Sequence, residues 1–513
     1  MTELPRSWAR ATFSDLGPWI GGGTPSKSNG AFWNGTIPWI SPKDMKSRVI
    51  CDTVDGITPE AIEQSSAKCV PPESVVIVTR SGILAHSLPV ALTAFESALN
   101  QDLKAMTPPH GMHAAYIAWA LRAFEHRILN TCRKGGTTVH SIEMPRLSMF
   151  EIPIAPTNEQ RRIVEKIEAL FEEIDRGVES LHAAKDAIAL YRQSLLKSAF
   201  EGRLTADWRA QNPDKLESPD ALLVRIREER ESRYQAALEE WKQADAEWRK
   251  SGKNAKRPRK PKRPRAIPIM PTSICPHGWM TVPLGLTIVD PIYGTSKKCG
   301  YGLGATSVLR IPNIGLGYID PSDLKSANFD EKESEKYSLQ EGDVLIVRSN
   351  GSLSIVGKPA IVRRQHTAYL FAGYIIRIRP VSGSILSKWL LYLMMEPNVR
   401  AQIEAKAKST SGVNNISAKE LQELNVPICS PAEQAEIIRL LDTRLEAAAM
   451  LDREIDADLA RANALRQSIL KKAFTGQLVP QDPDDEPASA LLERIQAGRA
   501  RTPARRSRAR VRA

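Results

Sequence analysis

Two long stretches of the chain repeat apolar residues at seven-residue intervals. The first, within residues 160–199, carries Ile167, Ile174, Leu181, Ile188 and Leu195. Such spacing is typical of a coiled coil, because it keeps one apolar stripe on one side of the helix. The second stretch carries Leu441, Leu451, Ile455, Leu465 and Ile469, but Arg444 and Asp458 interrupt its stripe. We therefore expect two helices of about 42 residues, roughly 60 Å long, the second with locally irregular packing.

The two stretches are copies of one sequence. Residues 192–204 match residues 466–478 at nine of thirteen positions, including a glycine just past each expected helix end, Gly202 and Gly476. The match continues upstream, where Glu159 corresponds to Glu433, and fades toward the pair Trp8 and Trp279. The chain is therefore a tandem repeat in which each copy is a divergent globular part followed by a well-matched helix.

A long amphipathic helix needs a partner to cover its apolar stripe. The other copy of the helix is the simplest partner, and two equivalent copies would pair antiparallel about a pseudo-twofold axis. Heptads alone leave open the alternatives that each helix packs on its own globular domain or dimerises between chains.

The globular parts contain many short β-rich runs bounded by Gly, Pro or Ser, which indicates mixed α/β domains. We predict an α+β fold of two such domains joined by two long antiparallel coiled-coil helices. The predicted segments are 1–155 (first domain), 156–205 (first long helix), 206–250 (central helical region), 251–270 (basic Pro-rich linker), 271–429 (second domain), 430–479 (second long helix) and 480–513 (C-terminal helix and Arg-rich tail). Within the central region, residues 218–250 form a charged amphipathic helix, either an appended surface helix or a docking element for a partner.

The 513 residues carry a net charge of +12, but the charge is not spread evenly. Residues 253–265 hold eight Lys/Arg and no acid, and residues 499–512 hold seven Arg and no acid. These two segments account for more than the whole excess, so the rest of the chain is close to neutral. Their composition is typical of flexible tethers, which can bind phosphate non-specifically.

Composition also places the protein in a compartment. The six cysteines form no CxxC pair, so neither a disulfide framework nor a zinc knuckle is indicated. No apolar run is long enough to span a bilayer, and no secretory leader is apparent. We expect a cytoplasmic protein without a membrane partner.

Motifs for catalysis are missing from the sequence. An adenine methyltransferase would need a Gly-rich cofactor turn and an Asn/Asp-Pro-Pro-aromatic motif for the flipped base, and neither occurs. No GxxxxGK[ST] motif for ATP and no HExxH motif for a metal is present. The sequence predicts neither an enzyme nor a metal site.

Three polar loops recur at corresponding places in both copies and carry groups suited to nucleic acid. Hydroxyls, ammonium groups and glycine-rich backbone suit phosphate oxygens, an Arg fork suits guanine, and Asn suits adenine. The candidate DNA-binding residues of the first copy are Thr24, Ser26, Lys27, Lys43, Arg80, Ser81, Lys134, Thr137, Thr138 and His140. Those of the second copy are Thr295, Ser296, Lys297, Arg348, Ser349, Asn350, Lys406, Lys408, Ser409, Thr410 and Asn414.

The chain resembles the specificity subunits of Type I restriction-modification systems. The resemblance rests on two diverged domains, each followed by a helix that starts near Pro-x-x-Glu-Gln and ends in Arg-Gln-Ser-Leu/Ile-Leu-Lys-x-Ala-Phe-x-Gly-x-Leu. The segment at residues 204–209, Leu-Thr-Ala-Asp-Trp-Arg, also resembles the central region of that family. The long basic linker and the Arg-rich tail depart from the family pattern, which leaves their roles open.

The resemblance implies a non-catalytic subunit that reads a bipartite, asymmetric sequence in double-stranded DNA. Each domain would be a target-recognition domain for one half-site, and the coiled coil would set the gap between them. The implied partners are two methyltransferase subunits, which methylate adenine N6 with S-adenosylmethionine, and two restriction subunits, which use ATP and Mg²⁺. Two alternatives are an adaptor whose two domains bind proteins and a DNA-modifying enzyme with an unrecognised site.

Overall fold

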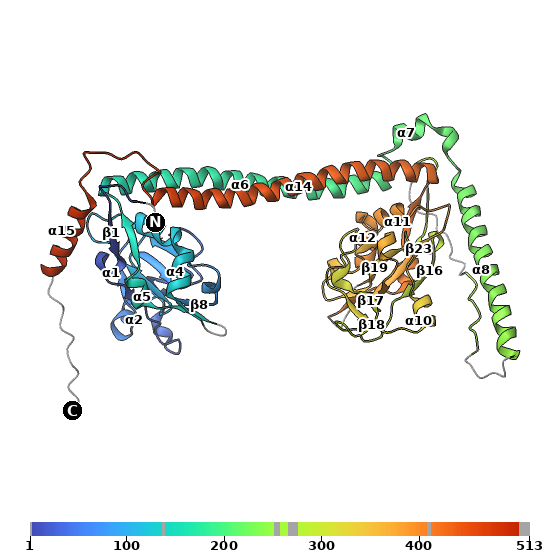
Figure 1. The fold of residues 1–513 in the computed structure, drawn as a ribbon, viewed down its shortest axis with the longest axis horizontal. Coiled ribbons are helices and arrows are strands. Elements are labelled where there is room, and N and C mark those ends of the chain that lie inside the picture. Colours follow the sequence, from blue (N-terminus) through green and yellow to red (C-terminus); the bar gives the residue numbers. More distant parts are fainter. Residues whose placement is uncertain (1–2, 136–138, 251–256, 265–274, 408–411, 502–513) are drawn as a thin grey trace, which may run out of the picture. The chain divides into compact units, whose positions relative to one another are not determined.

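The computed structural model describes residues 3–135, 139–250, 257–264, 275–407 and 412–501. The chain divides into two compact units, of which unit 1 combines Met1–His182 with Asp456–Ala513 and unit 2 is Ala183–Ile455. Each unit contains one globular domain, the first part of the long helix that follows it and the last part of the other long helix (Figure 1).

The two long helices are α6 (Thr157–Phe200) and α14 (Pro431–Ala473). Within unit 1, Asp175 of α6 forms an ion pair with Arg466 of α14 at 2.5 Å, and within unit 2, Arg192 of α6 pairs with Asp452 of α14 at 2.7 Å. The partner's number falls as the α6 number rises, so the helices run antiparallel, as predicted. A glycine with positive φ follows the end of each helix, Gly202 at +70° and Gly476 at +72°, which is the conformation expected just past a helix terminus.

Two predicted seam residues do not lie in the seam. Leu451 and Leu465 are 51% and 52% exposed. They share a heptad position with Arg444 and Asp458, whose charges require water, so this edge of α14 faces solvent. The other predicted seam residues are buried or half-buried: Ile167, Ile174, Leu181, Ile188, Leu195, Leu441, Ile455 and Ile469.

The first part of each long helix also packs on the domain that precedes it. In unit 1, the Phe171 ring lies 4.9 Å from the Trp119 ring of the domain. In unit 2, Ile437 and Leu441 belong to the core of the second domain. Pairing between helices and packing on the preceding domain, which the heptads presented as alternatives, therefore occur together.

The phenylalanine of the repeated helix-end motif explains why that motif recurs. Phe474, at the end of α14, packs with its ring 5.2 Å from Tyr116 in the core of the first domain. Phe200, at the end of α6, packs 4.5 Å from Trp389 in the core of the second domain. Each helix thus ends by filling the core of the domain from the other copy.

The first domain contains three sheets and an antiparallel pair, β1-β14, that joins the start of the domain to the strand before α6. The sheet orders are β2-β11-β7-β9-β4, β5-β3-β10-β6 and β12-β13-β8. Its strands are β1 (Ala9–Thr12), β2 (Ile20–Gly21), β3 (Trp33–Ile40), β4 (Val49–Ile50), β5 (Asp55–Ile57), β6 (Cys69–Val70), β7 (Val75–Val78), β8 (Arg80–Ser81), β9 (Val90–Thr93), β10 (Ser97–Leu99), β11 (Leu103–Met106), β12 (Arg133–Lys134), β13 (His140–Ile142) and β14 (Glu151–Ile154). Its helices are α1 (Phe13–Leu16), α2 (Pro59–Gln64), α3 (Ala114–Ala123), α4 (Glu125–Cys132) and α5 (Met144–Ser148).

The second domain repeats this plan, with β15-β25 as the pair before α14. The other orders are β16-β23-β19-β21, β18-β17-β22 and β20-β24. Its strands are β15 (Met280–Pro283), β16 (Ile288–Tyr293), β17 (Thr306–Leu309), β18 (Lys325–Ala327), β19 (Val344–Val347), β20 (Ser349–Asn350), β21 (Pro359–Ile361), β22 (Leu370–Phe371), β23 (Ile375–Pro380), β24 (Asn414–Asn415) and β25 (Asn425–Ile428). Its helices are α9 (Leu284–Thr287), α10 (Glu331–Lys336), α11 (Ser387–Leu393), α12 (Pro397–Lys406) and α13 (Ala418–Gln422).

Each long helix is followed by an extension that packs on the domain of the other copy. The extension of α6 contains α7 (Ala206–Gln211) and α8 (Pro219–Lys250), and that of α14 contains α15 (Ala488–Arg501). The two extensions make corresponding ion pairs, Glu217–Arg225 in unit 2 and Glu486–Arg494 in unit 1. Within the part of the chain that the structure describes, no helix is long and apolar enough to cross a membrane.

Part of the basic linker is not the flexible tether that its composition predicts. Residues 257–264, which we call the strap, lie against α8 through Arg257, Lys260 and Arg263. The difference arises because α8 offers acids and tryptophans as partners, which the composition of the linker alone does not reveal. The rest of that linker, residues 251–256 and 265–274, and residues 502–513 of the tail lie outside the described residues.

Candidate DNA interface

In the second domain, two of the three predicted loops pair directly: the second loop, which begins at Arg348, and the third loop, which contains Asn414. Arg348 follows the core strand β19, and the next two residues form β20, which pairs with β24 so that Ser349 faces Asn415 and Asn350 faces Asn414. Arg348 Nε donates a hydrogen bond to Asn415 Oδ1 at 3.1 Å. The Arg348 guanidinium lies 4.6 Å from the centre of the Tyr293 ring. These contacts hold the guanidinium in one place and leave Arg348 partly exposed.

The first loop of the second domain, at Thr295, joins the edge formed by Arg348 and the β20-β24 pair through backbone hydrogen bonds. The Gly373 amide donates to the Thr295 carbonyl at 2.7 Å, and the Arg348 amide donates to the Tyr374 carbonyl at 2.9 Å. The segment around Tyr374 therefore connects the loop at Thr295 to the loop at Arg348. Tyr374 and Tyr293 are 63% and 38% exposed. Neither tyrosine was predicted from the sequence to contact DNA, although a tyrosine beside the end of a strand is a pattern that the sequence shows.

Several residues predicted to contact DNA in this domain have structural partners instead. Thr295 is only 5% exposed, and its hydroxyl accepts a hydrogen bond from the Lys297 amide at 3.1 Å. The Thr295 side chain is therefore enclosed within its own loop, and its contact with DNA stays a prediction. Lys297 Nζ pairs with Glu333 at 2.7 Å, and Lys406 Nζ pairs with Glu423 at 3.8 Å. Ser296 is exposed, and Lys408, Ser409 and Thr410 lie outside the described residues.

The first domain brings its second and third loops together in the same way. In the sheet β12-β13-β8, Arg80 and Lys134 both face Ser141 from opposite sides, and Ser81 faces His140. Arg80 is exposed and has no hydrogen-bond or ion-pair partner among the described residues. Thr137 and Thr138, between β12 and β13, lie outside the described residues.

A chain of hydrogen bonds connects the first loop of this domain to the edge at Arg80. Asn100 Nδ2 donates to the Thr24 hydroxyl at 3.3 Å, and Asn100 Oδ1 accepts from the Asp102 amide at 2.7 Å. The Asp102 carbonyl accepts from the amide of Thr79, the residue before Arg80, at 2.8 Å. Both domains therefore join their first loop to the Arg-Ser loop through a segment that sequence reasoning missed.

The remaining candidates of the first domain lie on exposed loops near the same strand ends. The Asn100 amide donates to the carbonyl of Ile40, the last residue of β3, and Lys43 follows that strand on an exposed turn. Ser26 and Lys27 are exposed, two and three residues after the half-buried Thr24. The resulting surface combines cations, hydroxyls and an imidazole, which suits a polyanion better than an apolar ligand.

Glu420, the acid of the capping box at the start of α13 in the second domain, stays charged. Although burial raises the pKa of Glu420, its hydrogen bonds with Ser417 and the charges of Lys406 and Lys419 lower that pKa overall. The described residues contain no group of three or more His, Cys, Asp or Glu side chains placed to hold a metal ion. The edge offers cations, hydroxyls and hydrogen-bond donors as binding groups.

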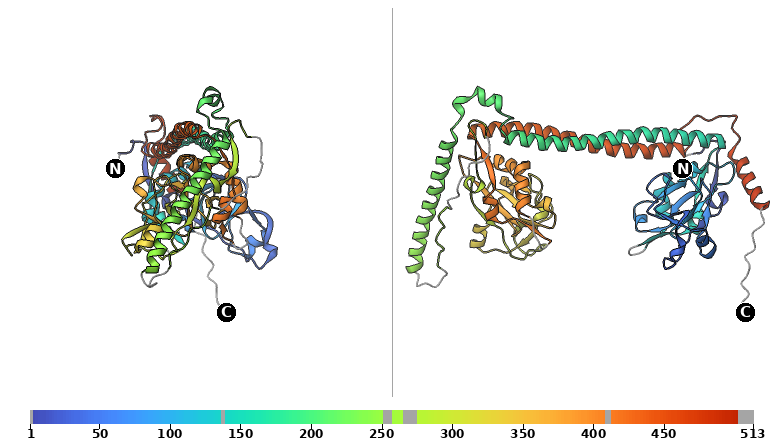
Figure 2. Two further views of the ribbon diagram at one scale, coloured as in Figure 1. Left: turned by 90° about the vertical axis from the view of Figure 1, so that its right-hand side faces the viewer. Right: turned by 180° about the vertical axis from the view of Figure 1, so that it is seen from behind.

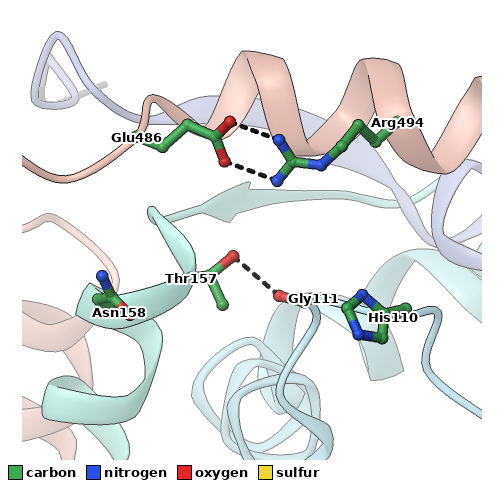
Figure 3. A pocket seen from close by; sticks show the side chains of 6 residues that line it. All are labelled: His110, Gly111, Thr157, Asn158, Glu486 and Arg494. Carbon is green, nitrogen blue, oxygen red and sulfur yellow. Dashed lines mark hydrogen bonds and ion pairs between the residues drawn. The ribbon is translucent and has the colours of Figure 1, made fainter.

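A separate pocket of about 400 Å³ lies in unit 1, beside the start of α6 and the start of α15 (Figure 3). Two pairs of the residues drawn there bond to each other. The Thr157 hydroxyl donates to the Gly111 carbonyl at 3.0 Å, and Glu486 forms a two-bonded ion pair with Arg494. This pocket is a junction between elements of unit 1.

Comparison with known proteins places this fold and its polar edges in a family. Residues 5–180 and 306–458 match the Type I restriction modification DNA specificity domain. The Type I restriction enzyme StySPI specificity subunit of Salmonella potsdam is 25% identical over 512 residues, covering 97% of this chain and 96% of that protein. The corresponding EcoKI subunit of Escherichia coli (strain K12) is 26% identical over 513 residues, covering 97% of both proteins.

The structural comparison agrees. A chain from the structure described as "Structural basis underlying complex assembly and conformational transition of the type I R-M system" has the same fold, with a TM-score of 0.63 at 18% identity, covering 93% of this chain and 100% of that chain. The family match spans more than half of the chain and includes both domains. The chain belongs to the family of Type I restriction-modification DNA specificity subunits.

Proposed function

We propose that the two polar edges read the two halves of a bipartite, asymmetric DNA sequence. The observation that carries the proposal is the recurrence of one loop arrangement with different side chains. The Arg-Ser loop pairs with a third loop in both domains, but Arg80 faces a strand with His140, whereas Arg348 lies among Asn415, Tyr293 and Tyr374. Two related surfaces with different donors suit two different half-sites.

Catalysis in this proposal belongs to partner subunits in the cytoplasm. Two methyltransferase subunits methylate adenine N6 with S-adenosylmethionine, and two restriction subunits use ATP and Mg²⁺. This chain supplies the sequence preference of both activities and the distance between the half-sites. The length of the α6 and α14 pair then determines how many unread base pairs separate the halves.

The test is to co-express the chain with the adenine methyltransferase encoded beside it and to map methylated adenines across the host DNA by single-molecule sequencing. We expect a two-part motif with a fixed gap that disappears when this chain is deleted. Methylation that is indifferent to the chain would instead favour an adaptor role.

Replacement of Arg348 by alanine is expected to relax the sequence preference at one base pair of the second half-site. A bidentate Arg contact to guanine contributes about 1–3 kcal/mol of discrimination, so selectivity at that position falls about 5- to 150-fold. Methylation rates on duplexes that vary one base pair at a time measure the effect. Arg364→Ala serves as the control, since it removes an exposed arginine of the same domain that has no ion-pair partner among the described residues. Equal selectivity of the Arg348 variant and wild type at every position would refute this role.

Insertion of four residues into α6 between Asp175 and Arg192 tests the spacing role. It adds about 6 Å to one helix and puts the Asp175–Arg466 and Arg192–Asp452 pairs out of register with each other, so methylation is expected to fall. A matched insertion in α14 between Asp452 and Arg466 restores the register. The doubly extended chain should methylate a motif whose gap is longer by about two base pairs, with both half-sites unchanged. An unaltered gap would argue against the ruler.

A further inference from the structure

The extension after α6 contains a part with no described counterpart in the other copy. α8 has 32 residues, whereas α15 has 14. The first turns of α8 pack on the second domain through Leu222, Leu223 and Ile226, and Arg230 then donates to the carbonyls of Gly285 and Ile288. Beyond Arg230, α8 continues for 20 residues beside the domain, directed away from the long helices and past the level of α10 (Figure 1), and Figure 2 shows the same helix from two further sides.

The strap folds back along this outer part of α8. Trp241 Nε1 donates to the Pro258 carbonyl at 3.0 Å. The Arg257 guanidinium donates to both carboxylate oxygens of Asp245, at 2.7 and 3.2 Å. The Asp245 side chain is only 6% exposed, and its hydrogen bonds with Arg257 lower its pKa. The strap is therefore held in a defined place, although its composition is that of a linker.

The prolines of the strap occur every third residue, at 258, 261 and 264. This spacing favours a polyproline II helix, which has three residues per turn and therefore three faces. Arg257, Lys260 and Arg263 share one face and contact α8: Arg257 binds Asp245, Lys260 lies 5.7 Å from the Trp241 ring, and Arg263 lies 3.7 Å from Glu231. The proline face is half-buried.

The third face carries Arg259 and Lys262. Both are exposed and have no hydrogen-bond or ion-pair partner among the described residues. At 3.1 Å per residue they are about 9 Å apart along the strap. The strap holds five Lys/Arg and no acid, so the two free cations lie on a segment whose other charges are already fixed. Because the prolines are half-buried, the strap does not present the proline face that a peptide-binding groove would recognise.

We propose that Arg259 and Lys262 bind phosphates of duplex DNA outside the half-site read by the second domain. The inference rests on the proposed function, because it places DNA at the Arg348 edge. Two contacts link α8 and α10 to elements of that edge, and the strap lies against α8 beside the first of them, because Arg263 is 3.7 Å from Glu231. Arg230 binds α8 to the start of β16, the strand that ends at Tyr293, and Glu333 of α10 holds Lys297 of the first recognition loop.

In the proposed arrangement, a duplex that lies across these loops continues along the outer part of α8. Contacts to phosphates carry no sequence information but add affinity and fix orientation. The described part of unit 1 has no equivalent helix and strap. The complex is expected to cover a flank beside the half-site of the second domain.

The test compares wild type with R259Q/K262Q in the methyltransferase complex isolated through a tag on the full chain. Binding is measured over a range of KCl concentrations to a duplex that extends about 30 base pairs beyond the second half-site. Loss of two phosphate contacts should make the slope of log K against log salt shallower by about 1.8. On a duplex truncated at the second half-site, wild type and variant should bind alike. Hydroxyl-radical protection of the flank should be lost in the variant, with both half-sites still protected.

The control, R227Q/R453Q, removes two exposed charges elsewhere in unit 2 that have no ion-pair partner within the described part of the chain, and it should leave the slope unchanged. If R259Q/K262Q and wild type show equal slopes while both still bind the motif specifically, the inference about the strap is overturned and the proposed function still stands. If wild type shows no preference for the mapped motif over random DNA, the proposed function fails and the inference fails with it.

Discussion

Exchange of residues 1–155 for the first domain of another specificity subunit should replace one half of the methylated sequence and leave the other half and the gap unchanged. The last strand of the domain, β14, ends at Ile154, and α6 begins at Thr157, so the junction falls between elements. The incoming domain must supply a tryptophan at the position of Trp8, because Trp8 Nε1 donates to buried Glu159 of α6 at 3.0 Å.

Mapping of methylated adenines in cells that carry the exchanged chain measures the result. The matched control exchanges residues 271–429 instead and should change the other half only. A change of both halves after either exchange would show that the two domains do not read DNA independently.

Glu433→Ala should lower the free energy of unfolding more than any other substitution proposed for this chain. Glu433, in the first turn of α14, is completely buried and accepts hydrogen bonds from the Thr205 hydroxyl at 2.7 Å and from Arg209 Nε at 3.0 Å. The Arg209 side chain is only 13% exposed and lies 5.8 Å from the Trp279 ring. Removal of the carboxylate leaves this guanidinium buried without a counter-charge, which costs about 3–5 kcal/mol of the free energy of unfolding.

Urea unfolding of the full chain, followed by tryptophan fluorescence, measures this loss. Glu436→Ala is the control on the same helix, since it removes one partner of an ion pair whose Arg439 side chain is 63% exposed. Exposed pairs contribute little, so the control should unfold close to wild type. Equal unfolding midpoints for Glu433→Ala and Glu436→Ala would contradict the role of the buried pair.

The long helices and the repeat could be predicted because their signals are local and occur twice. A seven-residue period, a glycine just past each helix end and a thirteen-residue match need no knowledge of distant contacts. The seam was predicted less well, since counting apolar residues selected Leu451 and Leu465 even though Arg444 and Asp458 at the same heptad position pointed that edge toward water.

The loops could be selected from sequence, but their meeting could not. Whether Arg348 approaches Asn415 depends on a strand pairing across 67 residues, and no local pattern specifies it. The same limit explains the strap. Its charge predicted a free tether, whereas a triplet spacing of prolines and a buried acid on α8 determine its position. Thr295 was selected for its hydroxyl, and only the folded loop reveals that this hydroxyl is enclosed.

The division of the chain into units also sets the order in which it can fold during synthesis. Unit 2 is one continuous segment and can complete its core while the ribosome is still at work. Unit 1 needs Phe474 and Leu491 to finish the core that begins at Trp8. At roughly 5–20 residues per second, the about 270 intervening residues delay that closure by roughly 15–55 s. During this interval the apolar positions that Phe474 and Leu491 later cover stay open, so the N-terminal domain, although made first, is the last to complete its core.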